Sequence, residues 1–143
     1  MEKDTKITGN ITELEVQTYM TKLGVQVSIP YGDRSRYDQI WDVNGKLFKV
    51  QVKHANYKNN AIEVHCASIV RRNGKRISLR YTADQVDGIA TFHNGKCYYI
   101  PIDQVPRQVK TLRFDKPKSN IESTVNWAID FEVEKQLQLD ASN

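Results

Sequence analysis

Residues 36–53 read RYDQIWDVNGKLFKVQVK, a stretch in which a turn signal lies between two apolar-rich runs. Its centre, Asn44-Gly45, separates two apolar-rich runs and predicts a hairpin with a two-residue loop, because both loop positions need a positive φ. A loop of that length places Asp38 directly opposite Gln51 on the neighbouring strand. Side chains alternate between the two faces of a strand, so Lys53 shares the face of Gln51. The hairpin therefore gathers an acid, an amide and a base on one patch.

The two faces of this hairpin differ in composition. One face places Trp41 opposite Phe48 and is typical of a hydrophobic core. It also holds Tyr37, Gln39, Val43, Lys46, Val50 and Val52. The Asp38 face is not fully committed to that core. Two interpretations stay open, ordinary polar surface or a functional site, because strand faces turned to solvent also carry Asp, Gln and Lys.

Length and composition indicate a single domain spanning residues 1–143. Of the 143 residues, 39% are hydrophobic and 27% are charged, as in soluble globular proteins. There is no apolar run of about 18 residues and no signal-peptide pattern, so we expect no membrane partner and a cytoplasmic location. Cys66 and Cys97 lie in strand-like runs without a CxxC pair, which predicts buried thiols rather than a zinc site or a disulfide.

The net charge of +4 conceals an asymmetry along the chain. Residues 1–118 contain 20 basic and 12 acidic residues, whereas residues 119–143 contain one basic and five acidic residues. This polarity suggests a polyanionic partner for the first part of the chain, although many basic proteins bind no specific partner.

Residues 10–23 are predicted to form a helix that ends before Gly24. Its apolar stripe comprises Val16, Tyr19, Met20 and Leu23. Glu13 lies at the margin of this stripe, where a carboxylate is unfavourable unless it is paired or bound to a cation. The alternative is a first-turn glutamate that is stabilised by the helix dipole.

Two further Asn-Gly turns predict two more hairpins. Asn73-Gly74 forms the tip of a basic hairpin near residues 62–82, and the tip reads RRNGKR. Asn94-Gly95 joins GIATFH to KCYYIP. Residues 25–29 alternate as a strand, and the Asn-rich stretch 56–60 is expected to be a loop.

A second helix is expected near the C-terminus. Ser119-Asn120 can cap a helix that starts near Ile121. Its packing positions are Val125, Ala128 and Ile129. Together the elements predict an α+β fold, or a mixed α/β fold if the sheet takes up a parallel strand. The sheet is expected to be mostly antiparallel, rich in hairpins and flanked by the N- and C-terminal helices.

The polar residues favour one kind of chemistry. Glu13 and Asp38 would supply two charges and Gln51 a neutral oxygen, and hard cations such as Mg²⁺ bind such oxygens together with water and substrate phosphate. Lys53 can orient water or stabilise charge that develops at phosphorus. These groups suit phosphodiester hydrolysis. The sequence marks no Gly-rich phosphate loop and no Ser/His/Asp grouping, and its histidines are scattered at His54, His65 and His93.

Glu13, Asp38 and the tripeptide 51–53 resemble the motif of PD-(D/E)xK nucleases, in which a helix glutamate, a strand aspartate and (Asp/Glu)-x-Lys build the metal site. Three longer stretches resemble the group I intron-encoded homing endonucleases of this superfamily, as found in cyanobacteria. They are GNITELEV (9–16), IPYGDRSRYDQIWDVNGKLFKVQVK (29–53) and VDGIATFHNGKCYYIP (86–101). The likeness covers roughly residues 7–130.

This resemblance implies a restriction-endonuclease-like core and site-specific cleavage of double-stranded DNA. It also implies dependence on Mg²⁺, with Mn²⁺ as a substitute. The expected partner besides DNA is the chain itself, as a homo-oligomer in which a tetramer is favoured and a dimer is the alternative.

The resemblance also assigns the site residues. Glu13, Asp38, Gln51 and Lys53 are then catalytic, and the metal ligands are Glu13, Asp38, Gln51 and the carbonyl of Val52. Gln51 departs from the acid that the superfamily usually has here, which leaves the site one charge short. Such a site should bind metal weakly without DNA phosphate, or it is a degenerate, non-cleaving site. Gln-x-Lys variants occur in nucleases of this kind, which favours activity.

The basic residues predict a DNA-binding surface. A tip that reads RRNGKR fits a two-stranded ribbon in the major groove, where arginine can contact guanine edges through two hydrogen bonds. The tip residues are Arg71, Arg72, Lys75 and Arg76. Phosphate contacts are expected from Arg34, Arg36, Lys49, Lys58 and Arg80. The alternative for each of these side chains is a solvated surface charge.

Three functions stay open from the sequence. The first is a homing endonuclease that cuts both strands of a long site and promotes intron mobility. The second is a restriction endonuclease or a Holliday junction resolvase, because the core motif does not distinguish substrates. The third is a catalytically dead DNA-binding protein.

Overall fold

The computed structural model describes residues 4–117 and 124–139, and its fold is the predicted α+β fold, dominated by sheet. The helices are α1 (Thr5–Lys22), the short α2 (Val133–Gln136) and the 3₁₀ helices η1 (Ile102–Gln104) and η2 (Ala128–Phe131). The strands are β1 (Gln26–Ser28), β2 (Gln39–Val43), β3 (Lys46–Val52), β4 (Ala55–Lys58), β5 (Ala61–His65), β6 (Ala67–Arg72), β7 (Lys75–Arg80), β8 (Gly88–His93), β9 (Lys96–Pro101) and β10 (Val109–Arg113).

The central sheet has five strands in the order β1-β2-β3-β8-β9. β3 and β8 run parallel and the other neighbours run antiparallel, so the sheet is mixed. The β2–β3 register confirms the predicted two-residue turn, with Trp41 opposite Phe48 and Gln39 opposite Val50. The turn itself, Asn44-Gly45, has the required positive φ values of 53° and 88°.

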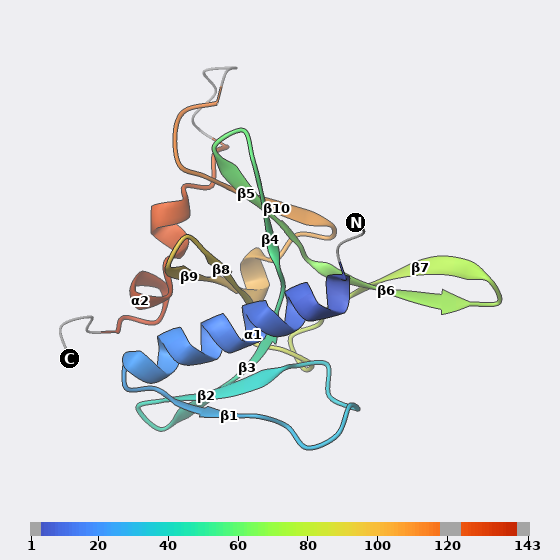
Figure 1. Ribbon diagram of the computed structural model, residues 1–143, viewed down its shortest axis with the longest axis horizontal. Coiled ribbons are helices and arrows are strands. Elements are labelled where there is room, and N and C mark those ends of the chain that lie inside the picture. Colours follow the sequence, from blue (N-terminus) through green and yellow to red (C-terminus); the bar gives the residue numbers. More distant parts are fainter. Residues whose placement is uncertain (1–3, 118–123, 140–143) are drawn as a thin grey trace.

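Helix α1 lies across one face of this sheet (Figure 1). Val16 and Met20 are fully buried there, which confirms the predicted apolar stripe. The helix begins at Thr5, earlier than expected, because Asp4 caps it and accepts two backbone N–H groups of the first turn at 3.0 and 3.4 Å. It ends before Gly24, as predicted, and Gly24 has a φ of 85°.

The opposite face of the central sheet packs on a second sheet, ordered β10-β5-β4. The prediction of a loop at 56–60 is wrong, because most of this stretch belongs to strand β4. Asn59 and Asn60 form the turn to β5 with φ values of 52° and 57°. Asparagine tolerates this left-handed region, so an Asn-Asn pair makes the kind of turn for which Asn-Gly is the usual signal.

The basic hairpin β6–β7 forms a separate two-stranded ribbon that projects from one side of the molecule (Figure 1). Its turn lies at Asn73-Gly74, as predicted, and its pairs run from Ala67–Arg80 to Arg72–Lys75. The ribbon is shorter than the expected range 62–82. The segment before it belongs to β5, where Ile62 and Val64 lie in the core of the second sheet.

The expected C-terminal helix from Ile121 is not found in the described residues; its predicted cap and start, 119–121, lie outside them. Residues 124–127 are not helical, because the carbonyl of Asn126 accepts the backbone N–H of Arg113 at 2.9 Å and holds this segment along β10. Helical turns begin only with η2. Ala128 is buried there as expected, whereas the side chain of Ile129 is 65% exposed.

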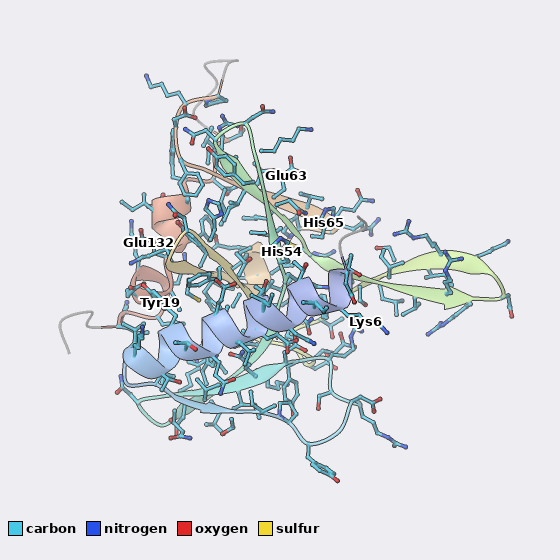
Figure 2. All side chains as sticks on the ribbon, in the orientation of Figure 1. Lys6, Tyr19, His54, Glu63, His65 and Glu132 are labelled. Carbon is cyan, nitrogen blue, oxygen red and sulfur yellow. The ribbon has the colours of Figure 1, made fainter. Side chains whose placement is uncertain are left out.

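Polar contacts attach the end of the chain to α1 and β9. Lys96 contacts the carboxylate of Glu134 at 2.9 Å, and the hydroxyl of Tyr19 donates to the same carboxylate. Figure 2 shows Tyr19 and Glu132 at this end of the molecule, opposite the ribbon β6–β7. Cys66 and Cys97 are buried free thiols, as predicted. Among the described residues, neither helix is long and apolar enough to cross a membrane.

Candidate active site

The peptide of Val52, at the end of β3, is the centre of the candidate site. Its N–H donates to the carboxylate of Asp38 at 2.9 Å, and its carbonyl accepts the side-chain amide of Gln51 at 3.4 Å. The backbone N–H of Asp38 also donates to the carbonyl of Val50 at 2.8 Å. Asp38 and Gln51 therefore both contact the Val52 peptide, although the paired register of β2 and β3 ends at Gln39 and Val50, one position short of the predicted Asp38–Gln51 pair.

Helix α1 brings Glu13 to this point. The carboxyl groups of Glu13 and Asp38 lie close enough to shift each other's protonation. Burial, the charge of Asp38 and the contact with its side chain raise the pKa of Glu13 to about 7. Burial also raises the pKa of Asp38, although the Val52 N–H, Glu13 and the Lys53 ammonium oppose that shift. Two neighbouring carboxyls that resist ionising together favour a divalent cation, whose charge would offset their mutual repulsion.

The donors at this site suit a hard cation. They comprise the carboxylates of Glu13 and Asp38, the amide oxygen of Gln51 and the carbonyl of Val52, and Mg²⁺-like ions prefer such oxygens and keep several waters. Within residues 4–117 and 124–139, no three His, Cys, Asp or Glu side chains are grouped so that they could hold a metal ion. Any cation here therefore depends on neutral oxygens for its third protein ligand, which is the role predicted for Gln51.

Lys53 connects the site to the base of the ribbon β6–β7. Its ammonium lies 3.5 Å from the carbonyl of Ala67 and 5.4 Å from the ring centre of Tyr81. The Arg36 guanidinium lies over the same ring at 4.4 Å and donates to the hydroxyl of Ser68 at 2.9 Å. Tyr81 is buried, so the cations of Lys53 and Arg36 both contact a fixed ring at the base of the ribbon.

A groove of about 800 Å³ runs from Lys53 along one face of the ribbon. Its polar lining comprises Thr5, Lys53, His65, Arg76, Ser78 and Gln108. Figure 2 shows His65 and Lys6 on the side of the molecule from which the ribbon projects. The cross-strand pairs place Arg71 with Arg76 and Arg80 with Ala67 on the groove face of the ribbon. The pair Arg72 and Lys75 belongs to the other face.

The other predicted DNA-binding residues differ in their exposure and in their distance from the ribbon. Arg34 is exposed in the loop before β2. Lys49 is half-buried, and its ammonium donates to the carbonyl of Asp84. Lys58 lies beside the β4–β5 turn, at the far end of that hairpin from the ribbon (Figure 1). Arg36 is also half-buried, because of its contacts with Tyr81 and Ser68. The tip residues and Arg80 are exposed.

Sequence reasoning missed the rest of the groove. His65, Ser78 and Gln108 line it, yet each looks like an ordinary surface residue in the sequence. Tyr81 directly follows the ribbon, and only its position next to a basic strand could have suggested a role. These residues come from separate segments, and only the docking of the ribbon against the body brings them together.

Comparisons with known proteins give the family of the chain and a solved structure with a similar fold. A model of the PD-(D/E)XK endonuclease family matches residues 3–134. Among solved structures, the bacterial homing endonuclease I-Ssp6803I has a similar fold, with a TM-score of 0.75 and 22% sequence identity over 96% of this chain and 94% of that one. No curated protein matches the sequence significantly.

Proposed function

Since the chain belongs to the PD-(D/E)XK endonuclease family, a family of nucleases that generally use divalent metal ions, we propose that it is a homing endonuclease that cleaves a specific double-stranded DNA site with Mg²⁺. The observation that carries the proposal is the paired carboxyls of Glu13 and Asp38 at the Val52 peptide, next to Lys53 in a groove that continues onto a basic ribbon. The likeness of fold to a homing endonuclease supports the choice within the family.

The residues of the site have separate roles in this proposal. Glu13, Asp38, Gln51 and Val52 would hold the cation, which when bound supplies Lewis-acid activation at the scissile phosphate. Glu13, whose pKa is raised to about 7, must lose its proton before it can bind the cation. The neutral amide of Gln51 adds an oxygen ligand without adding repulsion toward the phosphate.

Lys53 is the residue proposed to act on the phosphate itself. Its ammonium lies on the groove and close to Asp38, whose pKa it lowers. From there it can stabilise negative charge on the phosphorane-like transition state or orient the attacking water. Mn²⁺ should replace Mg²⁺, because both accept oxygen ligands in octahedral geometry.

The ribbon β6–β7 is proposed to read the DNA. A two-stranded ribbon fits the major groove, and its exposed tip carries Arg71, Arg72, Lys75 and Arg76. Arg34 and Arg80 are exposed and remain proposed phosphate contacts. Lys49 and Lys58 are also proposed to contact phosphates, farther along the DNA from the ribbon. Arg36 would contribute by holding the base of the ribbon.

We also propose that the chain works as a homo-oligomer, with a tetramer favoured and a dimer as the alternative. One site of this kind serves one strand, so a double-strand cut needs a second copy. The exposed residues Ile7, Ile11 and Leu14 form an apolar strip along α1 that supports self-association. Light scattering in solution should give at least twice the chain mass of 16.5 kDa.

A cleavage selection on randomised DNA tests the function. The protein should cut one long site in MgCl₂, should not cut in EDTA, and should lose cleavage with Lys53→Ala. Efficient cutting of a four-way junction without sequence preference would favour a resolvase, and cutting of a short palindrome would favour a restriction enzyme. Binding without cleavage in either Mg²⁺ or Mn²⁺ would favour a dead DNA-binding protein.

A further inference from the structure

The side chain of Gln39 is the most deeply buried amide among the core residues described, with only 1% of its surface exposed. Its Nε2 donates to the backbone carbonyl of Glu13 at 2.8 Å. Its Oε1 accepts the indole N–H of Trp41 at 3.0 Å. A hydrogen-bonded chain therefore runs from Trp41 in the sheet, through Gln39, to Glu13 on α1.

Packing alone does not explain this glutamine. It occupies a core position of β2, and its bond to the buried indole N–H of Trp41 accounts for only one end of the amide. The carbonyl of Glu13 lies inside α1 and already belongs to the intrahelical ladder, so the bond from Gln39 is additional to it. The bond therefore does not serve to satisfy an otherwise unpaired helix carbonyl. What the bond does is attach α1 to β2 at the backbone of Glu13.

The place of this bond relates it to the metal site. Gln39 follows Asp38 directly in the sequence. Asp38 is one proposed metal ligand, and Gln39 binds the backbone of Glu13, which is another. The residue before Glu13 is attached as well, because the hydroxyl of Thr12 lies 3.1 Å from Nδ1 of His54, next to Lys53. Helix residues advance by about 1.5 Å along the axis, so a small slide of α1 would separate the two carboxyls.

We propose that Gln39 is a positioning residue that holds the backbone of Glu13 against β2 and so keeps the Glu13 carboxyl beside Asp38 for cation binding. This inference rests on the proposed function, because it takes Glu13 and Asp38 to be cation ligands. Gln39 itself does not touch the cation or the DNA. Its effect on catalysis passes through the position of Glu13.

The test compares the two ends of the hydrogen-bonded chain. Gln39→Met keeps the length of the side chain and removes both bonds, whereas Trp41→Phe removes only the bond on the sheet side. Both variants change the core and should lower thermal stability. Only Gln39→Met should weaken binding of Mn²⁺, by about tenfold, which is the lower end of the usual effect of outer-shell groups. Trp41→Phe should leave Mn²⁺ binding within about twofold.

The readout is the electron paramagnetic resonance signal of free Mn²⁺, titrated against the full chain without DNA. The Mg²⁺ concentration for half-maximal cleavage should rise in parallel for Gln39→Met. Thr91→Val is a further control, because the Thr91 hydroxyl is buried in β8 without a hydrogen-bond partner. Equal effects of Gln39→Met and Trp41→Phe on Mn²⁺ binding would overturn the inference.

Glu13→Gln and Asp38→Asn separate failure of this inference from failure of the proposed function. If both variants lose Mn²⁺ binding and Gln39→Met retains it, the positioning role is wrong and the metal site stands. If neither loses Mn²⁺ binding, the metal site is wrong, and the inference falls with it.

Discussion

The hairpins β2–β3 and β6–β7 have the same kind of Asn-Gly turn but differ in what surrounds them. Asn44-Gly45 and Asn73-Gly74 have nearly the same φ values, 53° and 88° in the first and 53° and 76° in the second. β2–β3 lies within the five-stranded sheet under α1, with Gln39 and Trp41 almost fully buried. β6–β7 has only its two strands, and beyond Ala67 none of its residues is buried.

This difference teaches that turn chemistry sets the register of a hairpin, whereas its neighbours decide its use. Neighbours on both faces of β2–β3 fix the positions of Asp38, Gln51 and Lys53 at its end, as the proposed metal site requires. In β6–β7, the polar side chains remain available to a partner, as the proposed DNA-reading ribbon requires. The following predictions test this division between chemistry in one hairpin and recognition in the other.

The largest effect is expected for Asp38→Asn in the buried hairpin. Asparagine can still accept the Val52 N–H but supplies no charge to a cation, so cleavage should fall at least about a thousandfold, or ~4 kcal/mol in the barrier. DNA affinity should stay within roughly tenfold, or about 1.4 kcal/mol. Cleavage rates and binding isotherms measure the two quantities, and nicking at the unmodified rate would contradict the site.

Gln51 offers the next largest effect and tests the departure from the usual acid. Gln51→Ala removes an oxygen ligand and should slow cleavage about a hundredfold, ~2.7 kcal/mol. Gln51→Glu should keep partial activity and bind metal more tightly without DNA, because it adds a charge beside Glu13 and Asp38. Rates and metal titrations of both variants decide this. Unchanged cleavage by Gln51→Ala would make Gln51 a bystander.

Alanine substitutions in the exposed ribbon should affect DNA binding alone. Arg71→Ala and Arg76→Ala lie on the groove face and should each lower affinity by about 1–3 kcal/mol, with altered preference at one base if the side chain reads that base. Arg72→Ala and Lys75→Ala, on the other face, are the matched controls and should have smaller effects. Equal losses for all four variants, without change in preference, would argue against groove reading.

Gly45→Ala and Gly74→Ala compare the two turns directly. Both glycines have a positive φ and space for a Cβ, so each substitution carries only the backbone cost, about 1–2 kcal/mol. We expect Gly45→Ala to lower the melting temperature of the whole protein. Gly74→Ala should leave it unchanged and speed hydrogen exchange in the ribbon only. The same drop in melting temperature for both would mean that the ribbon unfolds together with the core.

The smallest effect concerns the pH dependence of stability without metal. The pKa of Glu13 is about 7 in the folded protein and 4.5 ordinarily, so the folded state binds more protons between these values. Stability should therefore fall as pH rises through this window, by less than about 1 kcal/mol because solvent screens the site. Mg²⁺ should stabilise the protein more at pH 8 than at pH 6. In thermal unfolding, the stability of Glu13→Gln should fall less with rising pH between about 4.5 and 7 than that of the unmodified protein.

Much of the fold was determined by local sequence features. Each Asn-Gly pair fixed a turn, because few residues other than glycine and asparagine accept a positive φ. The β2–β3 register then followed from that turn, with Val43 opposite Lys46 and Trp41 opposite Phe48. One failure was local in origin, because Asn59-Asn60 makes an equivalent turn with a weaker signal, whereas the other came from a tertiary contact. The C-terminal segment is held against Arg113 by a contact that no periodicity reveals.

The sequence by itself determined which residues could carry the chemistry, but only the tertiary structure decided how they meet. The docking of α1 set the distance between Glu13 and Asp38, and the packing of Tyr81 joined Lys53 to the ribbon. The groove residues His65 and Gln108 come from separate strands and loops. Turns and periodicity depend on neighbouring residues, whereas these contacts depend on how distant segments pack, and that information is spread over the whole core.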